Sequence, residues 1–238
     1  MTTRRDMIKA GVGLAEILAA GKAPAAFVRS MLGLRNAMLD ENRVPYDSKV
    51  EWLLNDDGKS YINPPINEPA YIVKPNDTVG IGLINTGDTN AWRAAFGVYK
   101  SDYSVIGIGR QSSYATRFRC AFGRFSATNI SLAVGVKYNL ELTKTSLVSN
   151  GSIVATFADS SANMPDGESV CLFKMRESNP SAFIGKISHF YIRDKAGAYK
   201  CYLEAVRIGT IGYFYDSVAK VLFPNATSGI LKPGTDVT

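Results

Sequence analysis

The chain has 238 residues, of which 46% are hydrophobic and 20% are charged, and its formal net charge is +6. This length and composition are typical of one folded domain, and they exclude a chain that is disordered throughout. The basic residues are spread along the sequence without a Lys/Arg run, so the charge predicts a mild preference for acidic partners and no nucleic-acid-binding tail.

The first 43 residues differ in composition from the rest, and residues 3–9 (Thr-Arg-Arg-Asp-Met-Ile-Lys) match the twin-arginine export pattern. Arg4 and Arg5 are the pair that such an export system would read. A Gly/Ala-rich stretch over 10–20 and small residues over 23–25 suit the body and the cleavage site of a signal. The stretch is too short and too interrupted by charges to span a bilayer. This interpretation predicts export to the periplasm or the cell surface.

An amphipathic helix that stays on the protein is the alternative for the same segment. Apolar residues recur at roughly helical spacing between Met7 and Leu34, and Glu16 interrupts the region that a signal would keep apolar. Such a helix would join copies of the chain into a homo-oligomer through residues 5–35. The protein would then be a component of a virion or of a cell-surface appendage.

A polar linker follows over residues 36–46, where Pro45 ends any helix. We therefore expect two parts: a leader or amphipathic helix with its linker over residues 1–43, and a folded domain over residues 44–238.

Short β-strands separated by turns are predicted from residue 49 onward. Asn150-Gly151 is the strongest hairpin signal, since both residues tolerate positive φ, and the turn residues 194–197 predict a second hairpin. No useful helical period follows the linker, so the pattern predicts an all-β fold of two packed antiparallel sheets. The expected strands are 50–54, 61–62, 71–73, 79–83, 94–99, 103–108, 117–125, 130–134, 138–143, 146–148, 152–157, 170–175, 184–192 and 199–206, with a short aromatic turn over 209–216 and a closing strand within 221–229.

Alternation within the strand 117–125 predicts one buried face and one basic face. Phe118, Cys120 and Phe122 point one way, whereas Arg117 and Arg119 point the other.

The strand 184–192 is apolar on both faces, as in a strand that is covered on two sides. Strict alternation places Ile187, His189 and Tyr191 on one face. We expect Ile187 and Tyr191 to join Leu172 and the apolar side of strand 117–125 in the core. His189 is expected to be a partly buried, hydrogen-bonded residue rather than a pH switch or a ligand.

The order of several motifs resembles the concanavalin A-like, laminin-G-like jelly-roll modules of bacterial exported proteins and phage particles. The resemblance covers the chain from about Tyr46 onward, and it implies a jelly-roll sandwich. Its departure from the family is the segment Leu203-Glu-Ala-Val206, where the family usually carries a proline. The motifs are Ser60-Tyr-Ile-Asn63, Phe96-Gly97, Arg117-Phe-Arg-Cys-Ala-Phe-Gly123, Tyr138-Asn-Leu-Glu-Leu142 with Ser149-Asn-Gly-Ser152, Val170-Cys-Leu-Phe-Lys-Met175, Gly185-Lys-Ile-Ser-His-Phe-Tyr-Ile192, Gly209-Thr-Ile-Gly-Tyr-Phe-Tyr-Asp216 and Val221-Leu-Phe-Pro-Asn-Ala-Thr-Ser-Gly229.

Catalytic patterns are missing from the sequence. Glycosidases on related folds place two or three carboxylates on alternate positions of one strand, whereas Glu51, Glu141 and Glu204 each stand alone in their strands. The sequence also has no Gly-x-Ser-x-Gly elbow and no Cys beside a base. We therefore expect a protein that is not an enzyme, and a degenerate glycosidase is the disfavoured alternative.

Metal and cofactor sites are not expected either. Cys120, Cys171 and Cys201 lie in predicted strands, either as three apolar thiols or as one disulfide and one thiol, and no Cys-x-x-Cys or second histidine accompanies them. Relatives of this family often bind Ca²⁺, which makes the loops 55–58 and 85–88 the alternative. Neither loop has the spacing of a defined calcium site, so we expect plain turns.

The remaining expectation is binding. Trp92 is an amphipathic aromatic residue in a predicted loop, and Arg110, Tyr114, Arg117 and Arg119 follow within a short distance in sequence. These five residues, with Tyr103, are the candidate ligand-binding face, unless the aromatics only pack and the arginines are only solvated. The leading hypothesis is a non-catalytic exported module that binds a glycan, preferably an acidic one, or a surface protein. The alternative is the structural assembly protein described above.

Overall fold

A computed structural model of the chain describes residues 44–65, 68–88, 93–99, 105–123, 127–158, 167–176 and 182–237. Arg4, Arg5, Tyr103 and Trp92 lie outside these residues, as does the segment 5–35. The division of the chain at residue 43 and the nature of the leader therefore stay predictions. No helix among the described residues is long and apolar enough to cross a membrane.

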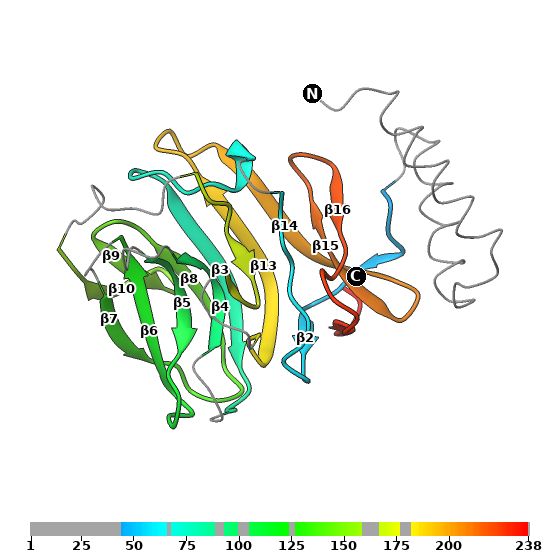
Figure 1. The fold of residues 1–238 in the computed structure, drawn as a ribbon, viewed down its shortest axis with the longest axis horizontal. Helices are drawn as coiled ribbons and strands as arrows, with labels where there is room; N and C mark the ends of the chain where they lie inside the picture. Colours follow the sequence, from blue (N-terminus) through cyan, green and yellow to red (C-terminus); the bar gives the residue numbers. More distant parts are fainter. Residues whose placement is uncertain are drawn as a thin grey trace. The chain divides into compact units, whose positions relative to one another are not determined.

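Two β-sheets pack as a sandwich, which confirms the all-β expectation (Figure 1). Every described strand pair is antiparallel except β12 with β4. A single 3₁₀ turn, η1 (Pro69–Tyr71), interrupts the described strands. The large sheet runs in the order β10 (Ser152–Thr156), β9 (Ser146–Ser149), β8 (Lys137–Leu142), β3 (Thr78–Asn85), β13 (Gly185–Arg193), β14 (Tyr199–Ile208), β15 (Ile211–Asp216) and β16 (Val221–Phe223), with β1 (Ser48–Lys49) on β14, β2 (Leu53–Asn55) on β13 and β17 (Lys232–Pro233) on β2.

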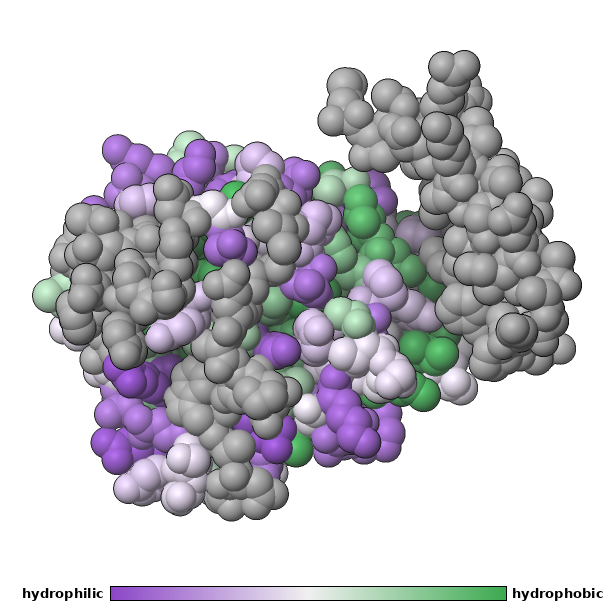
Figure 2. Space-filling model, viewed as in Figure 1, coloured by the Kyte–Doolittle hydropathy of each residue, from purple (hydrophilic) through white to green (hydrophobic). Residues whose placement is uncertain are grey.

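The small sheet packs its inner face on the large one. Figure 2 shows mixed polar and apolar surface on one side of the molecule, with hydrophobic surface near β15 and β16, where Val218 and Val221 are exposed. The strand order of the small sheet is β11 (Cys171–Leu172), β4 (Arg93–Tyr99), β5 (Val105–Arg110), β6 (Arg117–Phe122) and β7 (Ala127–Ser131), with β12 (Met175–Arg176) also on β4.

Both predicted hairpins form. Asn150 and Gly151 join β9 to β10 with φ values of 49° and 84°, as a primed turn requires. The turn after β13 leads directly back into β14, and the Asp194 carboxylate accepts hydrogen bonds from the backbone N–H groups of Ala196 and Ala198, both at 2.9 Å. The hydrogen-bonded carboxylate fixes the turn that brings the two strands together.

Some expected strands are wrong. Ile62 makes only an isolated bridge to Leu172, and the segment 69–71 is the 3₁₀ turn η1. Prolines at 64, 65 and 69 lack the N–H that a strand ladder needs, which accounts for both interruptions. The segment over 211–216 is a full strand rather than an aromatic turn, and β16 ends at Phe223 because Pro224 follows.

The interior is the predicted one with one exception. Phe118, Cys120, Phe122, Leu172 and Ile187 are fully buried and belong to the hydrophobic core. Tyr191 does not belong to this core, because its ring lies on the outer face of the large sheet, over Gly80.

A β-bulge at Ser188 causes this exception. Ile187 pairs with Leu83 and His189 pairs with Gly82, so Ser188 is an extra residue in β13. The bulge shifts the alternation by one position. Inward positions after it are Phe190 and Ile192, which are core residues, and His189 and Tyr191 point outward.

The sequence left two states for the cysteines: three thiols, or one disulfide and one thiol. The structure has three thiols, since Cys120, Cys171 and Cys201 are all buried and none forms a disulfide. Burial raises the pKa of the Cys120 and Cys201 thiols to about 12 each. These two thiols stay protonated at neutral pH and pack as small apolar groups.

Candidate functional site

The predicted basic face exists in part. Arg117 and Arg119 are exposed on the outer face of β6, and Tyr114 is 50% exposed in the loop before it. The guanidinium carbon of Arg117 lies 5.1 Å from the centroid of the Tyr114 ring, within cation–π range. Trp92 lies outside the described residues, so its place relative to this face stays a prediction.

Arg110 does not lie on that face. It follows Ile106 and Ile108 on the inner side of β5, it pairs with Phe118 in register, and its side chain is fully buried. Its Nη2 is 2.6 Å from the Asp88 carboxylate, and the same carboxylate oxygen lies 3.1 Å from Arg93 Nε. Arg110 therefore belongs to a buried charge cluster rather than to a ligand-binding surface.

The loops considered for Ca²⁺ use several of their polar side chains in contacts within the chain. The buried Asn55 amide donates to the backbone carbonyls of Ser60 and Phe183, and the Asn85 amide donates to those of Ala115 and Leu132. Asp56 is paired with Lys232. Within the described parts of the chain, no group of three or more His, Cys, Asp or Glu side chains is placed to hold a metal ion.

A different surface has the features of a binding site, namely the outer face of the large sheet over β3, β13 and β14, which lie side by side (Figure 1). His189 and Tyr191 of β13 and Tyr202 of β14 share this face. Their ring planes are parallel within 3–4°, with centroids 6.1, 6.1 and 5.8 Å apart. Parallel rings with centroids 4.5–7 Å apart are offset from one another rather than directly superposed. We call these three rings the aromatic platform.

Two glycines of β3 let the platform lie flat. A Cβ added to Gly80 would meet Tyr191 Cζ at 2.0 Å and the two adjacent ring carbons at 2.4 and 2.5 Å, so the ring lies across the backbone with its face toward Gly80. A Cβ on Gly82 would meet Ser188 Oγ at 2.0 Å and His189 Cε1 at 2.6 Å. Only glycine leaves room for rings at this height above the sheet.

Tyr199 forms a wall on the platform. Its ring is perpendicular to those of Tyr191 and Tyr202, with centroid distances of 5.4 and 5.1 Å, and it is 45% exposed. Tyr191 beneath it is only 8% exposed, whereas His189 and Tyr202 are half-buried. The accessible floor is therefore His189 and Tyr202, with Tyr199 standing at one end.

Polar groups surround the rings. The Tyr191 hydroxyl and Arg193 Nη2 both donate to Glu141, the second at 2.7 Å, and the Arg193 guanidinium lies 5.1 Å from the Tyr191 centroid. Glu204, opposite His189 on β14, is paired with Lys49 at 2.6 Å. Each of these two carboxylates is thus engaged by a cation.

The platform is uncharged at neutral pH. Burial lowers the pKa of His189, the nearby Lys137 lowers it further, and Glu204 opposes them weakly. The ring is oriented by a 3.1 Å hydrogen bond between its Nδ1 and Ser188 Oγ, as expected for a partly buried histidine. Burial and the hydrogen bond to Glu141 raise the pKa of Tyr191 far above its ordinary value.

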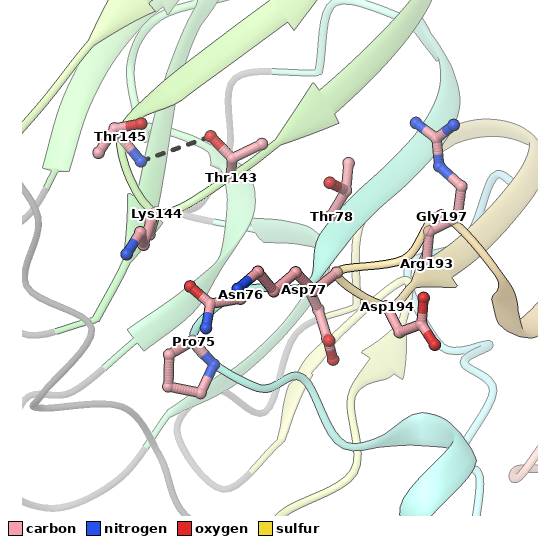
Figure 3. A pocket seen from close by; sticks show the side chains of 11 residues that line it. Pro75, Asn76, Asp77, Thr78, Thr143, Lys144, Thr145, Arg193, Asp194 and Gly197 are labelled. Carbon is pink, nitrogen blue, oxygen red and sulfur yellow. Dashed lines mark hydrogen bonds between the residues drawn. The ribbon is translucent and has the colours of Figure 1, made fainter.

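An open pocket of about 440 Å³ adjoins the platform at the ends of the same strands. It lies between three turns, and Figure 3 shows Asn76, Thr143 and Lys144 on one side and Arg193 and Asp194 on the other. Arg193 belongs to both places, since it covers Tyr191 and lines the pocket.

Tyr199 and Tyr202 were not identified from the sequence as binding residues. Their signal was present in two patterns: glycines at alternate positions of β3, and His or Tyr at positions 189, 191, 199 and 202 of the facing hairpin. To see that these rings lie over these glycines, one must know the register between β3 and β13, and the bulge at Ser188 shifts that register.

The fold is similar to that of a solved Bacteroides ovatus protein that is proposed to bind carbohydrate. The two structures superpose with a TM-score of 0.54 at 13% sequence identity, over 80% of this chain and 62% of that one. The chain thus spans less than two thirds of the length of that protein. No known protein family and no curated protein sequence matches the chain.

Proposed function

We propose that this sandwich is a non-catalytic carbohydrate-binding module, and that the aromatic platform with the Tyr199 wall holds one sugar ring. The observation that carries the proposal is the set of parallel, outward-facing rings held flat by Gly80 and Gly82.

The physical fit is between two amphipathic surfaces. A pyranose ring has an apolar face of C–H groups and a polar edge of hydroxyls, and an aromatic platform with a polar rim matches both. His189 and Tyr202 supply the floor, while Lys49, Glu204 and Lys137 lie at its edge. The arrangement needs no metal and no catalytic base.

The fold supports the same proposal at a coarser level. A two-sheet sandwich with a TM-score of 0.54 to a protein proposed to bind carbohydrate is consistent with the concanavalin A-like, laminin-G-like jelly-roll assignment made from the motifs. We propose that assignment here, together with an exported location resting on the Arg4-Arg5 motif.

A glycan array with the full chain tests the proposal. Tyr199→Ala and Tyr202→Ala should each weaken the wild-type hits by about 10-fold, which corresponds to about 1.4 kcal/mol. Tyr114→Ala removes a similarly exposed tyrosine beside an arginine on the basic face, and it should change affinity by less than about 2-fold.

Thermal unfolding of each variant separates lost binding from lost folding. The proposal fails if the wild-type chain binds no glycan. It also fails if its hits persist in Tyr199→Ala and Tyr202→Ala but disappear in Tyr114→Ala or Arg119→Ala, because the basic face would then be the binding site.

A further inference from the structure

The pocket beside the platform has a different chemistry from the platform itself. Its lining contains no aromatic side chain, and it combines hydroxyls, an amide and charged groups. A second hollow of about 430 Å³ adjoins it and shares the segments 75–77 and 194–195. Both hollows lie between the turn before β3 and the turn after β13, and we call the two together the groove.

Positive charge is in excess around this groove. Lys74, Lys144 and Lys195 line it, and Lys195 is exposed with no hydrogen bond or ion pair among the described residues. Asp77 is neutralised by Lys200 at 2.8 Å. Asp194 has no cationic partner within the described parts of the chain, and the two linings together hold three lysines and two carboxylates.

Hydroxyl donors complete the environment of an anion. Thr78 and Thr145 line the pocket, and their hydroxyls make no hydrogen bond within the described residues. Hydroxyl and ammonium groups are among the side-chain donors that bind carboxylate or sulfate oxygens, and charge-assisted hydrogen bonds to such anions are the strong ones.

The distance between platform and pocket sets the size of the ligand. His189 and Arg193 are four residues apart on β13, which is about 13 Å at the ordinary rise of a strand. Tyr202, the other floor residue, is opposite Tyr191, two residues from Arg193, and so lies about 7 Å from the pocket. Tyr199 and Arg193 both lie against the Tyr191 ring at the boundary between floor and pocket, so a ligand that occupies both places needs more than one sugar unit.

We propose that this pocket binds an anionic substituent, a carboxylate or a sulfate ester, of the oligosaccharide whose neighbouring sugar ring lies on the platform. The inference rests on the proposed function, and it names the ligand class as acidic oligosaccharides. Stacking on the platform supplies affinity for the sugar ring, and the lysines of the pocket select the charged partner over the neutral one.

The test is an array on which each acidic oligosaccharide is printed beside its carboxyl-reduced or desulfated counterpart. The full wild-type chain should bind the acidic member at least about 10-fold more tightly. Lys144→Gln combined with Lys195→Gln should reduce this preference to about 2-fold and leave binding of the neutral member unchanged. Carboxylate pairs and sulfate pairs on the array distinguish the two anions.

Lys220→Gln is compared with Lys195→Gln alone as the charge-matched control, since each removes one exposed positive charge and Lys220 lies in the turn between β15 and β16. Equal binding of acidic and neutral members by the wild-type chain overturns the inference and leaves the proposed function standing. A loss of preference in Lys220→Gln as large as in Lys195→Gln also overturns it, because net charge alone would then explain the effect. Absence of binding to every member overturns the proposed function instead.

Discussion

The two outer faces of the sandwich each carry an exposed tyrosine beside an arginine, but the support beneath the two pairs differs. On the small sheet, Tyr114 sits in a loop after Ser113, which has a φ of 66°, and Arg117 contacts its ring. On the large sheet, Tyr199 stands on two further rings, and Arg193 covers one of them. Similar residues thus make a solvated pair in one place and part of a rigid surface in the other.

Glycines explain the difference. Both sheets have glycines on their outer faces, and in both the missing Cβ makes room for a side chain from elsewhere in the chain. On the large sheet the space over Gly80 holds a tyrosine ring, whereas on the small sheet the space over Gly97 and Gly107 holds the methyl end of Met175, 3.1 and 3.3 Å from their virtual Cβ atoms. An aromatic ring presents a flat surface to solvent, and a methionine side chain does not.

The largest loss of stability is expected from substitution of Asp88, because this carboxylate pairs with the buried Arg110, which lies on neither outer face. Asp88→Ala leaves the buried guanidinium of Arg110 and that of Arg93 without their carboxylate, and it should lower the free energy of unfolding by about 3–5 kcal/mol. Urea unfolding measures this. Arg119→Ala, on the exposed basic face, should cost less than about 0.5 kcal/mol, and equal effects of the two substitutions would place Arg110 at the surface after all.

Gly80→Ala should displace the Tyr191 ring from its flat position on the large sheet, and it should cost less stability than Asp88→Ala. The new methyl group overlaps the Tyr191 ring, so we expect about 1–3 kcal/mol of destabilisation from overpacking and a loss of glycan binding of about 10-fold.

Gly107→Ala is the matched control for this substitution, since its Cβ meets Phe96 O at 2.5 Å on the small sheet. It should destabilise the fold by a similar amount and keep the affinity of the folded protein unchanged. If both substitutions abolish binding equally, the flatness of the platform is not what binds the ligand.

The smallest effect concerns the pH dependence of His189. Its pKa in the folded state is lower than the ordinary value of 6.5, so the unfolded chain takes up a proton at a higher pH than the folded one. Stability contributed by the neutral ring is fully present above about pH 6.5, and it decreases as the pH falls below this value. Urea unfolding of wild type and His189→Gln at pH 7.5 and 5.5 should show a larger loss in the wild type, and parallel losses would contradict the effect of burial.

Much of the fold could be predicted because it follows from local patterns. The alternation from Arg117 to Phe122 predicts the two faces of β6 correctly, and Asn150-Gly151 predicts the hairpin between β9 and β10. Both signals depend only on neighbouring residues. The site could not be predicted in the same way. Ser188 is compatible with either side of a strand, so nothing in its type indicates an extra residue, and the bulge reverses the face of Tyr191.

Arg110 shows a second limit of the same kind. Arg110 lies near Arg117 and Arg119 in sequence, which suggests one basic surface. Alternation along β5 instead points its side chain inward, where Asp88 compensates the charge. The compensating residue is 22 positions away, and sequence spacing does not reveal it.

The three buried cysteines, none of which forms a disulfide, also bear on what the domain needs in order to fold. Because no covalent cross-link holds the two sheets together, folding requires no oxidant, and neither glutathione nor an oxidising compartment changes the contacts that stabilise the sandwich. Formation of the two-sheet sandwich is therefore independent of disulfide chemistry.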